Sequence, residues 1–350
     1  MIISLNRNNR RLEMLAEIRI GRRSVGRCVF GLAWIAAFVT NNDWSWGAEP
    51  VLQVAIIHAD LTPEPGDAAC VTKAKGKCVA LQGAAAAARA KLVSSVQAKC
   101  GGALVAPENL RGATGLGYDG LDADCATELG HPAANAADVA ECIARRYACR
   151  SNGLYSTQSP RAGELLRIAG VGAEADGCLP DYAGDGEDVG DPVLGKVLQG
   201  CASTITKAAT SFIGKKLSGL TKCVDKVFSC IQTKPGDAAC LTKADQACGK
   251  EAAKIAAARA KIAPAIDKKC GGIDFNVHLL PPRAANLAAL VATLPGSDTL
   301  ENLTNYETAL RLRHECAAED LLRSIAPRAE VLLEAFAPAL ALPSAACSVP

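Results

Sequence analysis

Alanine, lysine and arginine recur in long stretches, and no segment shows the sustained apolar–polar alternation of a half-buried strand. Residues 83–99 and 250–269 are rich in Ala, Lys, Arg, Glu and Leu, which favour helix. Each stretch leads into Cys-Gly-Gly, a sequence typical of a glycine C-cap. Pro264 predicts a kink or break in the second stretch. The pattern therefore predicts an all-α fold.

The same pattern occurs twice. PGDAAC at residues 65–70 returns at 235–240, and AAARAK at 86–91 returns at 256–261. KCGG at 99–102 likewise returns at 269–272, all with an offset of 170 residues. The offset then becomes 167, at which Cys149 corresponds to Cys316. We interpret this as an internal duplication of about 64–171 and 234–336, giving two related disulfide-stapled helical-hairpin units.

Six cysteines in residues 201–270 lie nearly symmetrically about Pro235-Gly236, where a turn is expected. Asp237 follows as a candidate helix N-cap. Two antiparallel helices each advance about 1.5 Å per residue, so cysteines equidistant from the turn should meet at one height. The sequence thus predicts a helical hairpin with three disulfides: Cys201–Cys270, Cys223–Cys248 and Cys230–Cys240.

The remaining cysteines allow more than one pairing. Ala292 and Ala309 replace Cys125 and Cys142 in the second unit, and this joint loss suggests a Cys125–Cys142 disulfide. The first unit has no counterpart of the hairpin's first arm, so Cys70, Cys78 and Cys100 are expected to pair downstream. A rival set of disulfides is then Cys100–Cys125, Cys78–Cys142 and Cys70–Cys149. Spacing alone does not choose between these connectivities.

Sixteen cysteines suit an oxidising compartment. Arginines precede an apolar run at 28–39, which is too short to span a bilayer comfortably and is followed by small residues near 47–48. We therefore expect a signal peptide at 1–48, a first unit at 49–171, an acidic linker at 172–192 and a second unit at 193–350. The mature protein would be periplasmic or extracellular, with no stable membrane span.

Signal removal leaves fifteen cysteines, so one must be unpaired or bridge to another molecule. We expect this cysteine to be Cys178, because it lies in the acidic linker outside both units. Elimination then leaves Cys316 with Cys347.

Charge and spacing give little support to several classes of partner and cofactor. The net charge is +2, so nothing favours nucleic acid as a partner. The cysteines are spaced more widely than zinc ligands usually are. The acidic linker lacks a complete calcium loop, because Ala183 and Pro192 occupy positions that need oxygen ligands. We predict no metal site and no cofactor.

No motif identifies a catalytic residue. Residues 115–120 match the dinucleotide fingerprint, but no strand is expected before them, so a turn is the preferred interpretation. None of the four histidines has metalloprotease spacing, and His314 is expected on the surface of a helix. These signals favour a protein that is not an enzyme.

Three strings carry a resemblance to a known group: KC-x6-CIQTKPGDAAC at 222–240, LGYD at 116–119 and RHEC at 313–316. They resemble an uncharacterised group of secreted, cysteine-rich helical-repeat proteins of deltaproteobacteria-like bacteria. In that group Ala292 and Ala309 would usually be cysteines, so this second unit departs from the pattern. The group has no assigned activity or functional residue to carry over.

The leading functional hypothesis is an exported, disulfide-stabilised helical repeat protein with a structural or binding role at the cell envelope. Its partner would be an unknown protein or envelope component. The alternative is an enzyme or small-ligand-binding protein with a site in the loops after Cys100 and Cys270.

Overall fold

The computed structural model describes residues 68–101, 105–171, 178–182, 184, 189–294, 300–344 and 347. Within these ranges the chain is helical and contains no strand, which confirms the all-α prediction. The predicted signal peptide lies outside the described residues. The longer helices are α4 (Ala68–Cys100), α7 (Ala136–Gln158), α9 (Pro192–Thr233), α10 (Ala238–Arg259), α11 (Ile262–Cys270) and α12 (Leu303–Ile325).

Shorter helices connect or follow the long ones. The α-helices are α5 (Pro107–Arg111), α6 (Asp122–Leu129), α8 (Ala162–Ile168) and α13 (Ala329–Phe336). Single turns of other helix types are η2 (Tyr118–Leu121), η3 (Phe275–Leu279), η4 (Leu287–Leu290) and η5 (Pro338–Leu340).

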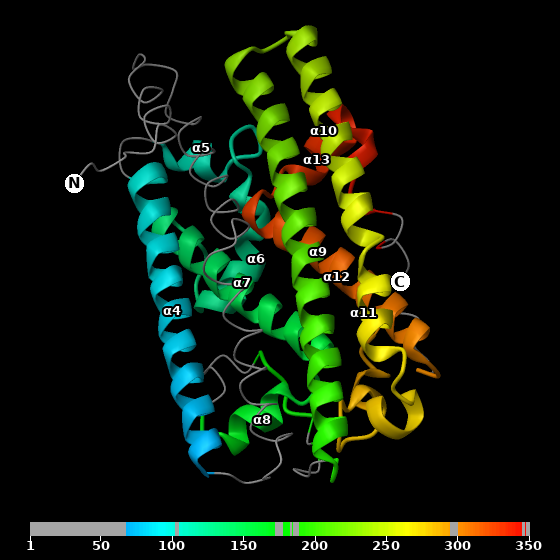
Figure 1. Cartoon of the computed structure of the whole chain (residues 1–350). Helices are drawn as coiled ribbons and strands as arrows, with labels where there is room; N and C mark the ends of the chain where they lie inside the picture. The colour runs from blue at the N-terminus through cyan, green and yellow to red at the C-terminus, as the bar shows by residue number, and fades with distance from the viewer. Residues whose placement is uncertain are drawn as a thin grey trace, which may run out of the picture.

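The hairpin of α9 with α10 and α11 is the longest feature of the fold (Figure 1). α9 begins where the Asp191 carboxylate accepts hydrogen bonds from the backbone N–H groups of Val193 and Leu194. The chain reverses at Gly236, whose φ of 81° favours glycine. The Asp237 carboxylate then accepts a hydrogen bond from the Cys240 N–H, as expected of an N-cap.

All three disulfides predicted for this hairpin are present. The Cα–Cα distances are 5.0 Å for Cys201–Cys270, 4.9 Å for Cys223–Cys248 and 5.7 Å for Cys230–Cys240. The second arm is divided between Arg259 and Ile262, just before Pro264. Proline has no N–H to donate to the carbonyl four residues earlier, so the helix breaks there.

Helix bounds in the two halves correspond closely. α7 and α12 begin and end 167 residues apart, and the side chains of Asn135 and Asn302 cap them. α4 begins and ends 170 residues before the combined span of α10 and α11, but has no proline and stays continuous. The duplication and the domain boundaries remain inferences from the sequence.

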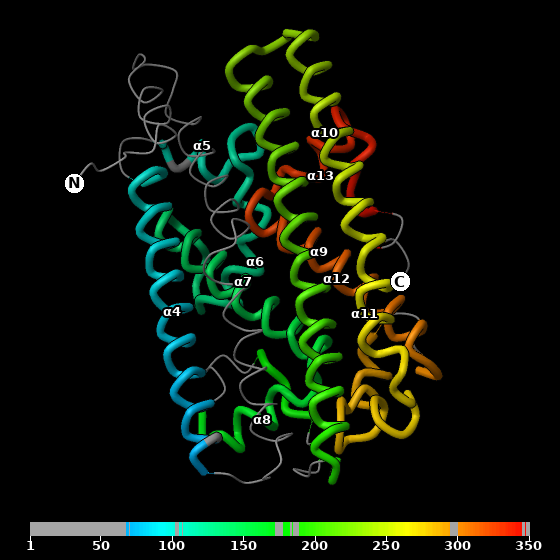
Figure 2. The backbone as a smooth tube through the Cα atoms, viewed as in Figure 1, coloured from blue at the N-terminus to red at the C-terminus, as the bar shows by residue number. Residues whose placement is uncertain are grey.

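The two halves share one hydrophobic core. Figure 2 traces the backbone path through both halves. α7 and α12 lie antiparallel, since Arg150 contacts Asp320 and Arg146 contacts Ser324, both at 3.3 Å. The Tyr118 hydroxyl donates to the Ile325 carbonyl at 2.7 Å, near the end of α12. The Tyr306 hydroxyl donates to the Thr157 carbonyl at 3.1 Å, near the end of α7. α9 packs against helices of both halves.

The prediction that Cys178 is unpaired is wrong, because it forms a disulfide with Cys149. The described part of the acidic linker also departs from a solvated chain: Leu179, Tyr182 and Val189 pack against the core. Burial of these apolar side chains holds the segment against the core, although the linker is rich in carboxylates.

The disulfides Cys125–Cys142 and Cys316–Cys347 are present as predicted. The rival set is wrong, since Cys125, Cys142 and Cys149 have other partners and Cys78 is a buried free thiol. Cys78 therefore does not pair downstream as expected. Cys100 is also disulfide-bonded.

Candidate functional site

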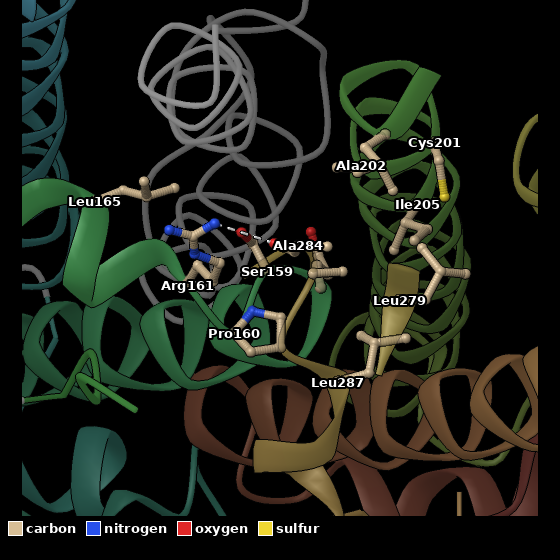
Figure 3. Close-up of a pocket in the computed structure, with 13 residues that line it drawn as sticks. Ser159, Pro160, Arg161, Leu165, Cys201, Ala202, Ile205, Leu279, Ala284 and Leu287 are labelled. Atoms are coloured by element: carbon tan, nitrogen blue, oxygen red, sulfur yellow. Dashed lines mark hydrogen bonds between the residues drawn. The ribbon is translucent and has the colours of Figure 1, made fainter. Parts of the chain in front are cut away.

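A cavity of about 40 Å³ lies between the first half of α9, the end of α7 and the loop after Cys270 (Figure 3). Its wall is mainly apolar. The residues that line it are Gln158, Ser159, Pro160, Arg161, Leu165, Leu198, Cys201, Ala202, Ile205, Leu279, Ala284, Ala285 and Leu287.

A second cavity of about 40 Å³ lies between the second half of α9, the end of α12 and the loop after Cys100. The residues that line it are Leu116, Tyr118, Thr221, Val224, Asp225, Phe228, Ile325, Ala326, Pro327, Arg328, Ala329 and Leu332. The two cavities therefore adjoin the loops after Cys270 and Cys100. These are the loops in which the alternative hypothesis places the site of an enzyme or small-ligand-binding protein.

The two cavities are built from corresponding residues. Residues 158–161 and 165 line the first, and residues 325–328 and 332, 167 positions later, line the second. Each wall contains four α9 residues. Counted along the sequence, each residue of one wall lies as many positions before Ile213 as its counterpart in the other wall lies after it, and Ile213 is fully buried. The corresponding pairs are Leu198 and Phe228, Cys201 and Asp225, Ala202 and Val224, and Ile205 and Thr221. This arrangement indicates an approximate twofold relation between the halves, with α9 crossing the axis.

One arginine at each cavity reaches the opposite half of the chain. The Arg161 guanidinium donates to the Arg283 carbonyl at 2.7 Å, and Arg328 donates to the Gly115 carbonyl at 2.8 Å. Arg161 also forms a bidentate pair with the fully buried Glu164, at 2.8 and 3.1 Å. The Arg328 guanidinium lies over the Phe228 ring, 5.7 Å from its centroid. Both arginines thus hold the halves together.

Gly115 and Gly117, in the glycine motif at 115–120, serve packing and a turn. A Cβ at Gly115 would lie 2.0 Å from the Asn109 carbonyl oxygen. A Cβ at Gly117 would lie 2.9 Å from the Arg328 side chain, and Gly117 has a φ of 77°. These glycines precede the short helix η2, so their structural context is not the strand–turn–helix of a dinucleotide site.

His314 is fully buried, so its expected surface position is wrong. Its Nδ1 lies 2.8 Å from the Leu310 carbonyl, and its Nε2 lies 2.7 Å from the Gln158 amide nitrogen. The neutral tautomer that donates from Nδ1 and accepts at Nε2 satisfies both contacts. Burial lowers the pKa of His314 to about 4, so the ring stays neutral at pH 7. His314 therefore joins α12 to the end of α7.

Each cavity has one polar group that could meet a small guest. At the first cavity, the buried Gln158 Oε1 atom has no hydrogen-bond partner. At the second cavity, burial raises the pKa of the Asp225 carboxyl to about 7. A hydrogen-bond donor suits both groups. The available volume, however, fits a few water molecules, whereas ligand pockets usually measure about 300–1,000 Å³.

Substituting Asp225 should change how stability depends on pH. Its folded-state pKa is raised, so the unfolded state releases the proton first as pH rises from about 4 to 7, and stability falls in that window. Asp225→Asn should gain on the order of 4 kcal/mol relative to wild type between pH 4 and pH 8, because the folded-state pKa is raised by about three units. Urea unfolding at both pH values measures this difference.

The matched control is Asp245→Asn, at an exposed position on α10. An Asp225→Asn protein whose stability relative to wild type is the same at pH 4 and pH 8 would contradict the assignment.

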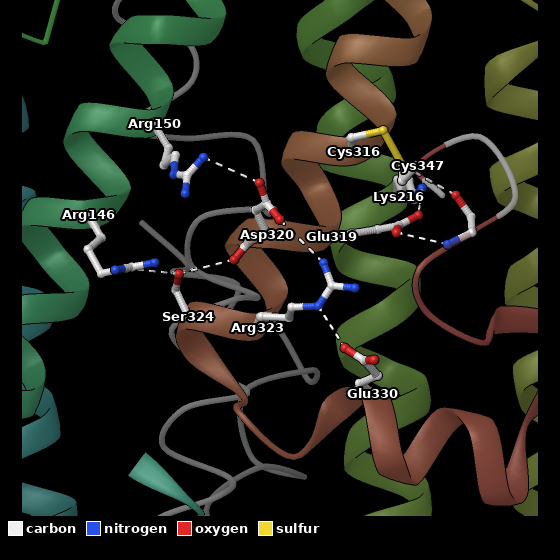
Figure 4. Close-up of polar contacts among 11 residues, drawn as sticks. Arg146, Arg150, Lys216, Cys316, Glu319, Asp320, Arg323, Ser324, Glu330 and Cys347 are labelled. Atoms are coloured by element: carbon white, nitrogen blue, oxygen red, sulfur yellow. Dashed lines mark hydrogen bonds and ion pairs between the residues drawn. A yellow bond between two sulfur atoms is a disulfide. The ribbon is translucent and has the colours of Figure 1, made fainter. Parts of the chain in front are cut away.

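A separate buried polar cluster joins α9 to α12 (Figure 4). The Lys216 Nζ atom lies 2.5 Å from Glu319 Oε1 and 3.4 Å from Glu315 Oε1. Glu315 also pairs with Arg259, and the second oxygen of Glu319 accepts a hydrogen bond from the Ser344 N–H at 3.0 Å. The Cys316–Cys347 disulfide fastens the C-terminal segment beside this cluster. Lys216, Glu315 and Glu319 are all buried.

Burial lowers the pKa of Lys216 to about 8 in spite of the neighbouring Glu319 carboxylate. The cluster is packed between helices and lines neither cavity. It is therefore best explained as an internal ionic contact.

Sequence reasoning missed this cluster. A signal was present, because Lys216 stands among the apolar residues Ile213 and Leu217, while Glu315 and Glu319 share one face of α12. The predicted disulfide cysteines lie in the two hairpin arms, in α6, α7 and α12, and at the C-terminal end. They do not form a shared site.

Within the described ranges, no group of three or more His, Cys, Asp or Glu side chains could hold a metal ion. The same part of the chain contains no helix long and apolar enough to cross a membrane. No protein-family model, curated protein or solved structure matches the chain. Its function must therefore be inferred from its own residues.

Proposed function

We propose that this protein is exported and acts as a rigid, disulfide-stabilised helical protein with a structural or binding role at the cell envelope. The observation that carries the proposal is the set of six disulfides within the described residues. Disulfides persist in oxidising compartments, and proteins with this many of them are rare in a reducing cytosol. The sequence-predicted signal peptide at 1–48 agrees with export.

The balanced charge and the small cavities support a binding or structural role over catalysis. A formal net charge of +2 gives no strong field for a polyanion. The two cavities found among the described residues, each of about 40 Å³, leave no room for an ordinary substrate beside a catalytic group. The resemblance to secreted helical-repeat proteins of deltaproteobacteria-like bacteria forms part of this proposal, and the partner would be a protein or another envelope component.

Export can be tested by comparing the full chain with a variant that lacks residues 1–48. The full chain should fractionate outside the cytoplasm, with its paired cysteines protected from a thiol-alkylating reagent. The shortened chain should remain in the cytoplasm with reduced cysteines. A full chain that stays cytoplasmic with reduced cysteines would rule out the proposal.

Small-molecule binding is a second candidate, favoured by the position of both cavities beside the loops after Cys100 and Cys270. The test is to add small alcohols and amides and follow the methyl NMR signals of Leu165 and Leu279. Ala202→Leu, which should fill the first cavity, is the control. Shifts in the wild type alone would support a guest there, and identical responses would count against it.

A further inference from the structure

The charge of the chain is unevenly distributed, although its total is small. Residues 192–270, which hold the hairpin of α9, α10 and α11, contain thirteen lysines and one arginine but five acidic residues. The hairpin therefore carries a formal charge of +9, whereas the whole chain carries +2 and the rest of the chain −7. A strong local field can thus exist on the hairpin, even though the total is nearly balanced.

Six exposed lysines form two rows along the hairpin, which we call the lysine face. They are Lys215, Lys222 and Lys226 on α9 and Lys243, Lys250 and Lys254 on α10. The spacing within each row is seven and then four residues. At about 100° of rotation per residue, this spacing keeps each row within about 40° around its helix.

Both rows lie on the side of the hairpin that faces away from the other helices. Nine residues make about two and a half helical turns, so they place two side chains on opposite sides of a helix. Lys222 follows the fully buried Ile213 by nine residues. Lys250 precedes Arg259 by nine residues, and Arg259 pairs with Glu315 on α12. Figure 1 shows α12 passing behind the hairpin, so the lysine face is the outer side.

The hairpin disulfides set the two rows beside each other. Cys223–Cys248 and Cys230–Cys240 fix the register of α9 against α10. Counted from the turn at Pro235-Gly236, each α9 lysine then has an α10 lysine within two residues of its own height, or about 3 Å. The pairs are Lys226 with Lys243, Lys222 with Lys250, and Lys215 with Lys254. Packed helices lie about 8–10 Å apart, so the six charges form a broad, flat patch.

Folding does not account for this arrangement. Lys254 pairs with Glu251 at 2.6 Å, but no ion pair within the described residues joins the other five lysines to an acid. Like charges at one height repel each other, so the two rows oppose the packing of the hairpin. A partner with a negative surface would remove this repulsion.

We propose that the lysine face docks on the surface of an anionic lipid membrane. Clusters of four to eight lysines or arginines on a helical surface attract anionic lipids in this way. A planar array of negative charges can meet both rows at once. The inference rests on the proposed function, because it names the envelope component that the protein would bind.

The residue types on the hairpin favour a membrane over nucleic acid. All six residues of the face are lysines, which act as point charges, whereas the planar arginine fork suits the bidentate recognition of phosphate groups. Base stacking needs exposed aromatic side chains. The aromatic residues of α9, Phe212 and Phe228, are buried, and α10 contains none.

The test measures cosedimentation of the purified, oxidised protein with lipid vesicles. Vesicles of phosphatidylcholine with about one third phosphatidylglycerol should bind the protein at about 0.05 M NaCl and release it at about 0.5 M. Pure phosphatidylcholine vesicles should bind it weakly at both salt concentrations, and they control for attachment through apolar residues.

Paired substitutions assign the binding to the lysine face. Lys222→Gln/Lys250→Gln should weaken binding to the anionic vesicles about 25-fold, because each lysine near such a surface contributes about fivefold. Lys222→Arg/Lys250→Arg keeps both charges and should bind like the wild type. The matched control is Lys73→Gln/Lys77→Gln, which removes two exposed charges from α4 and should change binding less than about twofold.

Three results would overturn the proposal: no binding to the anionic vesicles at low salt, equal losses in the two glutamine variants, or tighter binding to a DNA duplex or to soluble polyglutamate than to the vesicles. The outcome is separable from that of the export test. An exported protein that ignores the vesicles would defeat this inference alone, whereas a vesicle-binding protein that stays in the cytoplasm would defeat the proposed function alone.

Discussion

Full reduction of the disulfides is expected to unfold the protein at room temperature. Removing a native disulfide typically costs about 2–5 kcal/mol, while a domain's whole free energy of unfolding is usually about 5–15 kcal/mol. Six disulfides lie within the described residues, and the core is rich in alanine, which buries less apolar area than larger side chains. The combined loss of the six disulfides should therefore exceed the free energy of unfolding that the packing of the helices alone supplies.

Circular dichroism melts with and without a phosphine reductant measure this effect. An unchanged melting temperature after complete reduction would show that the helices pack stably without the disulfides. Paired alanine variants add a graded comparison. Loss of Cys201–Cys270, which closes a separation of 69 residues, should cost about 4 kcal/mol by the chain-entropy relation. Loss of Cys230–Cys240, with a separation of 10, should cost about 3 kcal/mol.

The three hairpin disulfides could be predicted because helical geometry converts residue spacing into height along an axis. The turn at Gly236 and the equal rise of both arms leave little freedom in the pairing. Cys125–Cys142 could be inferred for a different reason, since both cysteines are absent from the corresponding positions of the second half. Both inferences use relations already present along the sequence.

The pairing of Cys178 could not be found in this way. Its carboxylate-rich surroundings suggest a solvated linker, but Leu179 and Tyr182 bring the segment back to the core. Close backbone approach also contributes, because a Cβ on Gly163 would lie 2.6 Å from the Pro180 carbonyl oxygen. Composition averages over such individual contacts, and the prediction that Cys178 is unpaired was therefore wrong.

For the candidate cavities, the sequence indicated only the neighbouring loops, those after Cys100 and Cys270, and not the residues that form the walls. Their walls join α9 to residues more than thirty positions away, and no local pattern encodes that contact. His314 illustrates the same limit, because its burial depends on Gln158 of the other half. A polar residue in a helical stretch looks exposed until the packing partner is known.

Removing the cation of the buried cluster should cost about 3–5 kcal/mol, the usual penalty for breaking a buried ion pair. Lys216→Met keeps a side chain of similar length but leaves Glu319 with only the Ser344 N–H contact in this cluster. Glu315 retains Arg259 and Arg311, so the penalty should fall mainly on Glu319. Urea unfolding of the oxidised protein at pH 7 measures the change.

The double variant Lys216→Met/Glu319→Gln should recover most of that loss. It removes both charges together, and a glutamine oxygen can still accept the Ser344 hydrogen bond. Desolvation outweighs pairing at Lys216, since its pKa lies below the ordinary value beside a carboxylate. A buried pair of this kind can be replaced by neutral groups at little cost, whereas removing one member leaves an uncompensated charge. If the two substitutions instead destabilise the protein additively, Lys216 and Glu319 do not act as a coupled pair.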